Sequence, residues 1–252
     1  MLRAIKTKMR ENTGQLIDER NIQLWNTLNK KYNILILESF ESNYMSCIKK
    51  KKLFRKQKAI IYILRNNLCS ASFTHELLHI YLASQKVFIG DDLIKLIFAN
   101  NNLYKIFSRN LRDHVCNCLE HAKMLPIYSE LGYENENFIS DFHKPKITIE
   151  EIELLQIKFS DKSKYYQEAI DFYIGKFFAM KACNNNSFNY ENYYCIFKKL
   201  DSQLFDILDN FWSSWIYYDI KKEDNNYIPI LRKFENELNN WITEKTIIFN
   251  GT

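Results

Sequence analysis

Apolar and polar positions in the first third of the chain follow two different periods. Residues Thr13 to Lys31 have apolar side chains at roughly helical intervals, which predicts a helix. Three short apolar runs rich in β-branched residues follow, at Tyr32 to Glu38, Asn43 to Ile48 and Ala59 to Leu64, and each is typical of a strand. A second amphipathic helix is expected between Cys69 and Gln85. This order predicts an α+β region with a small mixed or antiparallel sheet.

Helical periodicity dominates the rest of the chain. The pattern predicts a short helix from Asp92 to Ala99 and another from Tyr104 to Met124, which Pro126 is expected to stop. A boundary near Pro145 would separate an α+β region, residues 1–145, from a helical region, residues 146–252, packed against it in one compact unit. Further helices are predicted at Thr148–Phe159, Lys164–Ala182, Tyr190–Ile220 with one break, and Ile228–Lys245.

Composition narrows the class of protein. Hydrophobic residues make up 46% of the 252 residues, whereas only five are glycine and three are proline, which argues against an all-β sandwich with many tight turns. The net charge of +5 is too small for a dedicated nucleic-acid binder. The basic segment from Lys49 to Lys58 lacks interleaved aromatic residues except Phe54, so it is interpreted as the solvated turn of a hairpin.

Localisation is inferred from what the sequence lacks. The six cysteines form no C-x-x-C pair, which favours reduced and mostly buried thiols. The N-terminal residues have no apolar core of signal-peptide length, and no stretch has the length of a membrane span. These features predict a cytoplasmic protein.

The main candidate for chemistry is the H-E-x-x-H sequence His75-Glu76-Leu-Leu-His79 within the predicted helix. Residues four apart lie on one face of a helix, so the two imidazoles could share one metal ion. Glu76 would lie beside the metal, where it could accept a proton from a bound water. Ser70 or Ser72 is expected to cap this helix.

A catalytic zinc site needs three protein ligands and an open position for water. No histidine or carboxylate follows His79 closely, so the third ligand must come from a later cluster, residues 112–121. Helical spacing places Glu120 and His121 about 100° apart, so both could border one cavity although only one points at the metal. His114 is a further alternative, and the less favoured interpretation of Asp113 to His121 is an exposed polar helix face without a metal.

The strand, the H-E-x-x-H helix and the carboxylate on a later helix resemble the zincin metallopeptidases, in particular the glutamate-ligand group called gluzincins. The resemblance covers roughly residues 58 to 125, and only His75, Glu76 and His79 match a motif firmly. It implies one zinc ion held by His75, His79 and Glu120, with Glu76 as the general base. The acidic residue that those families place three or four positions after the third ligand is absent after Glu120.

The activity that the resemblance implies is hydrolysis of peptide bonds by a zinc-activated water. In that scheme His121 would stabilise the oxyanion, with Tyr128 and His143 as weaker candidates. The substrate would be a peptide or one intracellular protein, and the strand Ala59 to Leu64 could bind it by edge pairing. The alternative is a non-catalytic helical interaction protein whose H-E-x-x-H motif is structural or vestigial.

Overall fold

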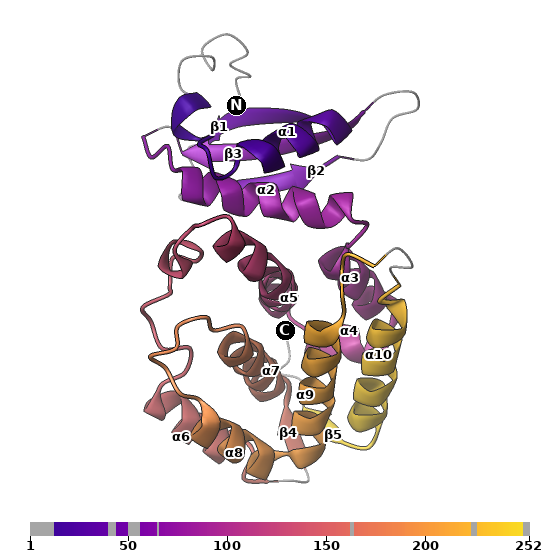
Figure 1. The fold of residues 1–252 in the computed structure, drawn as a ribbon. Coiled ribbons are helices and arrows are strands. Elements are labelled where there is room, and N and C mark those ends of the chain that lie inside the picture. The colour runs from indigo at the N-terminus through magenta and orange to yellow at the C-terminus, as the bar shows by residue number, and fades with distance from the viewer. Residues whose placement is uncertain are drawn as a thin grey trace. The chain divides into compact units, whose positions relative to one another are not determined.

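The computed structural model describes residues 13–39, 44–49, 56–64, 66–161, 164–222 and 226–248 (Figure 1). They form two compact units. The first unit comprises the described parts of residues 1–87 together with 124–142, and the second comprises 88–123 and the described parts of 143–252. One unit boundary therefore falls beside the predicted one near Pro145, whereas residues 88–123 group with the C-terminal helices. Helix α5 (Arg109–Glu130) begins in the second unit and ends in the first.

The first unit is built on a mixed sheet of three strands in the order β1-β3-β2. Strand β1 runs parallel to β3, and β2 runs antiparallel to it. Since β3 is paired on both sides, the expectation that this strand binds an extended peptide along its edge is wrong. The elements of the unit before α5 are η1 (Thr13–Gln15), α1 (Ile22–Lys31), β1 (Tyr32–Ser39), β2 (Met45–Ile48), β3 (Gln57–Leu64) and α2 (Ser70–Ser84), and η2 (Asn135–Asn137) follows it.

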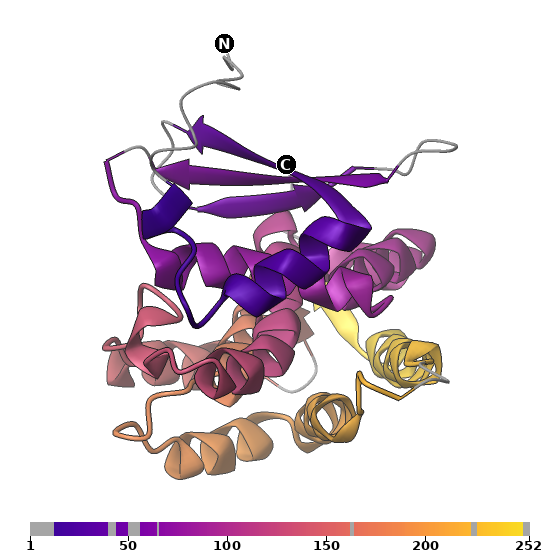
Figure 2. The ribbon, with the colours of Figure 1, turned by 45° about the horizontal axis from the view of Figure 1, so that its top comes forward.

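Helices α1 and α2 cover one face of this sheet (Figure 2). Alternate residues of β1 and β3 point toward the helices, and three residues of α2 at helical spacing, Phe73, Leu77 and Ile80, pack in the same core. His75 lies two residues from both Phe73 and Leu77, about 200° around the helix, so it points away from the sheet. His79 shares that orientation because it follows His75 by four residues.

The second unit is helical apart from one pair of short strands. Helix α7 has a fully buried face that includes Tyr173, Phe177 and Phe178, and it packs against α4, α6 and α9. The elements are α3 (Ile89–Ala99), α4 (Asn101–Ile106), the first part of α5, α6 (Ile149–Lys158), β4 (Lys164–Tyr166), α7 (Gln167–Lys181), α8 (Glu191–Leu200), α9 (Ser202–Tyr217), α10 (Ile228–Thr243) and β5 (Thr246–Ile248).

The structure corrects two predicted helix boundaries. The helix expected from Tyr104 to Met124 is divided into α4 and α5, because Ser108 begins a new helix. The Ser108 side chain accepts a hydrogen bond from the Leu111 amide, and its own amide donates to Asp171. Pro126 does not stop α5, which continues to Glu130. A proline removes one intrahelical hydrogen bond, and the helix continues where packing holds both sides.

Two other expectations also differ from the structure. The C-terminal region is not all helical, because β4 and β5 pair in parallel. Strands of three residues, separated by some eighty positions, leave almost no local signal. The first helix begins at Ile22 rather than Thr13. The single break expected between Tyr190 and Ile220 is confirmed: it falls at Asp201, whose carboxylate accepts a hydrogen bond from the Leu204 amide and caps α9. Most of the basic segment, residues 50–55, lies outside the described residues.

The structure also bears on two further expectations, the state of the cysteines and the presence of a membrane-spanning helix. All six cysteines are free thiols, but only Cys116 and Cys118 are buried, so the prediction of mostly buried thiols is wrong. None of the helices in the described ranges combines the length and the apolar character that crossing a bilayer requires.

Candidate metal site

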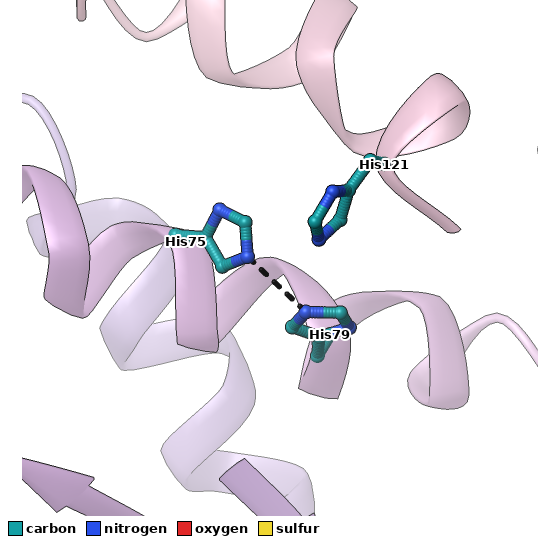
Figure 3. Close-up of side chains that lie close together, drawn as sticks. All are labelled: His75, His79 and His121. Carbon is teal, nitrogen blue, oxygen red and sulfur yellow. Dashed lines mark hydrogen bonds between the residues drawn. The ribbon is translucent and has the colours of Figure 1, made fainter. Parts of the chain in front are cut away.

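Two imidazoles of α2 meet as the motif predicts. The Nε2 atoms of His75 and His79 lie 3.3 Å apart, and the ring planes are inclined by 64° (Figure 3). Zinc bound to imidazole at about 2.0–2.1 Å in tetrahedral geometry holds its ligand nitrogens about 3.3–3.4 Å from one another. The two Nε2 atoms therefore already have the separation that one zinc ion requires.

The N-terminal end of α2 is held by a polar cluster, which we call the Asp18 clasp: Asp18, Arg20, Ser70 and Tyr133. The Ser70 hydroxyl donates to the Asp18 carboxylate at 2.7 Å and lies 2.7 Å from the Tyr133 hydroxyl, which also donates to Asp18 at 3.0 Å. Arg20 donates to the same carboxylate at 2.6 Å. The expected serine cap is therefore wrong: Cys69 is the N-cap residue without a side-chain hydrogen bond, and Ser70 joins α2 to the clasp.

The clasp changes the acidity of its carboxyl group. Burial by itself would raise the pKa of Asp18, but the hydrogen bonds from Arg20, Ser70 and Tyr133 outweigh it and lower that pKa well below its usual range. The Arg20 guanidinium lies 4.0 Å from the centre of the Tyr133 ring, so its charge also faces an aromatic surface. An ionised Asp18 therefore anchors the first turn of α2, one and a half turns before His75.

Aromatic packing positions His75 from the other side. The Phe138 ring lies 4.7 Å from the imidazole of His75, centre to centre, and 5.0 Å from the Tyr128 ring. Tyr128 in turn stacks on Tyr133 of the Asp18 clasp at 4.9 Å. Since Tyr128 lies in the last part of α5, these contacts join the end of that helix to α2 within the first unit.

His121 brings a third imidazole to the pair. One ligand nitrogen from each of His75, His79 and His121 lies within 4.8 Å of the other two, and Figure 3 shows the three rings turned toward a common point. His121 precedes Tyr128 on α5 by seven residues, or two helical turns on the same face. Among the described residues, no other three side chains of this kind form such a group. Three half-buried imidazoles are a donor set suited to zinc, copper or another ion of borderline softness.

Glu120 and His114, the other proposed ligands, are not members of this group of described residues. A carboxylate oxygen of Glu120 is 2.8 Å from where a Cβ on Gly90 of α3 would lie, and it contributes, after burial, to raising the pKa of Cys116 to about 12. His114 lies two turns before His121, about 10 Å along the axis, and its Nε2 atom is 3.2 Å from the Gly175 carbonyl oxygen. The structure therefore groups His121, the second choice of the sequence analysis, with His75 and His79.

Glu76 is buried, with 6% of its surface exposed, between the His75 side of α2 and the side that packs on the sheet. Carboxylates are rarely buried unless a charge or several hydrogen bonds compensate for the lost hydration. The other residues considered for oxyanion binding differ in access, because Tyr128 is fully buried and His143 is exposed.

Comparison of the chain with protein-family models, with curated proteins and with solved structures gives no match. The resemblance to the zincins therefore rests on the H-E-x-x-H residues themselves, and the geometry of the three imidazoles is the independent observation beside it.

Proposed function

We propose that the chain is a zinc-dependent hydrolase that cleaves peptide bonds, with His75, His79 and His121 as the metal ligands and Glu76 as the general base. The main support is that three imidazole nitrogens lie within 4.8 Å of one another while a buried glutamate follows the first histidine directly. This proposal moves the third ligand from Glu120 to His121. The zincin resemblance, with Glu120 as ligand and His121 as oxyanion donor, stays a prediction that metal analysis can test.

Each residue of the proposed site has a defined task. His75 and His79, whose Nε2 atoms lie 3.3 Å apart, would hold the zinc ion together with His121. A catalytic zinc ion with three protein ligands would leave one position for water and substrate. Zinc, when bound, supplies a Lewis acid that makes water a nucleophile near neutral pH and polarises a carbonyl group. Glu76 would accept a proton from the attacking water and deliver it to the leaving amine as the C–N bond breaks.

The test compares the parent chain with the Glu76→Gln variant. Both should bind one zinc per chain, measured by elemental analysis after removal of loosely bound metal, because glutamine replaces no ligand. Only the parent should cleave a mixture of unstructured peptides, followed by mass spectrometry of the products, and the variant should lose at least about a hundredfold in rate. Equal cleavage by both proteins would exclude Glu76 as the base.

The same experiment addresses the alternative of a non-catalytic interaction protein. A parent chain that binds stoichiometric zinc and cleaves none of the peptides would contradict the peptidase proposal and favour a structural metal site. A parent chain that binds no zinc, with unchanged unfolding temperature when zinc is added, would contradict both the metal site and the hydrolase.

A further inference from the structure

Two residues of the second unit fasten α5 on either side of His121. The Trp215 indole of α9 donates a hydrogen bond of 2.8 Å to the Leu119 carbonyl oxygen, and both residues are fully buried. The Lys123 ammonium donates to the carbonyl oxygens of Ile216 and Tyr218 at 2.9 and 2.6 Å, and these carbonyls lie at the C-terminal end of α9. The same ammonium lies 5.0 Å from the centre of a Trp215 ring. We call these contacts the α9 clamp.

The α9 clamp acts on the face of α5 opposite to His121. Leu119 and Lys123 are four residues apart and share one face, whereas His121 lies midway between them, about 200° around the helix. Contact with α9 on one face therefore directs the imidazole of His121 to the other. An imidazole nitrogen about 6 Å from the helix axis moves by about 1 Å for every 10° that the helix turns. Metal–ligand distances tolerate deviations of only about 0.2 Å, so small rotations matter.

α5 needs this support at that point because Pro126 weakens it. Proline has no amide hydrogen, so the intrahelical hydrogen bond to the Ala122 carbonyl, directly after His121, cannot form. Helices bend or turn most easily at such a position. The α9 clamp lies across the turn before Pro126, and the Trp215 side chain is itself fixed by stacking on Tyr218 at 5.7 Å and by edge contact with Tyr227 at 5.8 Å.

We propose that Trp215 and Lys123 are positioning residues for the metal site: they set the rotation of α5 that points His121 at the ion. This inference rests on the proposed metal site. It also assigns a task to the C-terminal helices, because α9 then determines the geometry of a ligand that it does not itself provide.

The test measures zinc affinity in the full chain by competition with a chromophoric chelator. Trp215→Phe keeps a buried aromatic ring but removes the hydrogen bond to Leu119, and it should weaken zinc binding about tenfold, the lower end of the range seen when outer-shell partners of metal ligands are changed. Lys123→Met should act in the same direction. The matched control is Trp212→Phe, the same change one turn earlier in α9 at a buried tryptophan, packed near Phe178, that makes no hydrogen bond to a described residue. It should leave the zinc affinity unchanged.

A double-mutant cycle separates positioning from general loss of stability. In the His121→Ala background, Trp215→Phe should cause no further loss of zinc affinity, because the side chain that it positions is gone. In the cobalt-substituted proteins, the visible absorption typical of tetrahedral cobalt should be weaker in Trp215→Phe than in the parent. In Trp212→Phe it should equal that of the parent. If the parent binds zinc and Trp215→Phe binds it equally well, or if the loss persists in the His121→Ala background, the inference is wrong. A parent that binds no zinc contradicts the proposed function instead.

Discussion

The two helices that provide the imidazoles are held in different ways. α2 lies on a sheet, its ligands are one helical turn apart, and the Asp18 clasp fixes its first turn through charged hydrogen bonds. α5 lies among helices in its first part, provides one ligand, and is fastened by the buried indole of Trp215 and the ammonium of Lys123. The spacing between the two α2 ligands is therefore intrinsic to the helix, whereas the position of His121 depends on tertiary contacts. Support for α2 should govern stability, and support for α5 should govern metal affinity.

The largest effect should follow the loss of a ligand. His75→Ala, His79→Ala and His121→Ala should each weaken zinc binding by more than about a hundredfold, since changes to outer-shell partners alone cost 10- to 100-fold. Glu120→Gln should change the affinity by less than about threefold, because its carboxylate lies against Gly90. Chelator competition on the four purified variants measures these values.

The reverse pattern would contradict the proposed ligand set. If Glu120→Gln lost the metal and His121→Ala kept it, the third ligand would be the one that the zincin resemblance implies. His121 would then be available to stabilise the oxyanion, as the sequence analysis expected. Circular dichroism of each variant controls for misfolding.

The sequence predicted what is local and missed what is distant. The pair His75 and His79 follows from helical spacing alone, and the three strands follow from short apolar runs. The choice between Glu120 and His121 depends on how α5 is rotated, which its own residues do not determine. The residues that set this rotation, Trp215 above all, lie almost a hundred positions away and carried no signal beyond being apolar.

The Asp18 clasp and the paired strands β4 and β5 were missed for the same reason. Asp18 meets Ser70 and Tyr133 only after three separate segments fold together, and each segment is unremarkable when taken alone. Pro126 was expected to end α5 because a proline removes one intrahelical hydrogen bond. The helix continues past the proline because tertiary packing holds it. Local patterns thus predicted most of the helices and strands. The third metal ligand depends on long-range packing, so local patterns left it undecided.

The Asp18 clasp should affect stability more than metal binding. Asp18→Asn should lower the free energy of unfolding by about 2 kcal/mol at pH 7, because it removes the charge that Arg20, Ser70 and Tyr133 bind. For a chain of this size that corresponds to a decrease of about 4–8 °C in Tm. Zinc affinity should change by less than about threefold, since the separation of His75 and His79 is set within one helix. Thermal unfolding and chelator competition measure the two quantities.

The effect of Asp18→Asn should also depend on pH. The folded-state pKa of Asp18 lies below the value of about 3.9 in the unfolded chain, so its contribution to stability is complete above that pH. The contribution decreases as the pH falls below about 4 and toward the lower folded-state pKa. The difference between parent and variant should therefore be full at pH 7 and shrink in acid. Glu19→Gln, at the exposed neighbouring carboxylate, is the control and should show neither effect.

The smallest effect, at Gly90, tests the location of the Glu120 carboxylate. A Cβ at this position would lie 2.8 Å from a Glu120 oxygen and 3.1 Å from the Cys116 Cβ, so Gly90→Ala must displace the flexible carboxylate and shift α3 slightly. Overpacking costs about 1–3 kcal/mol, and the gain in helix propensity offsets up to about 1 kcal/mol. We expect a net loss of about 1 kcal/mol in chemical denaturation.

Gly175 of α7 provides the matched control for Gly90, because it also faces α5 from a helix but its Cβ would make only ordinary contacts, at 3.4 Å to Leu111 and 4.0 Å to His114. Gly175→Ala should be neutral or stabilising by up to about 1 kcal/mol. Zinc affinity should be unchanged in both variants, since displacing Glu120 leaves His121 directed at the α2 pair. A tenfold loss of affinity confined to Gly90→Ala would mean that the carboxylate takes part in coordination, and α5 would then present Glu120 to the metal in place of His121.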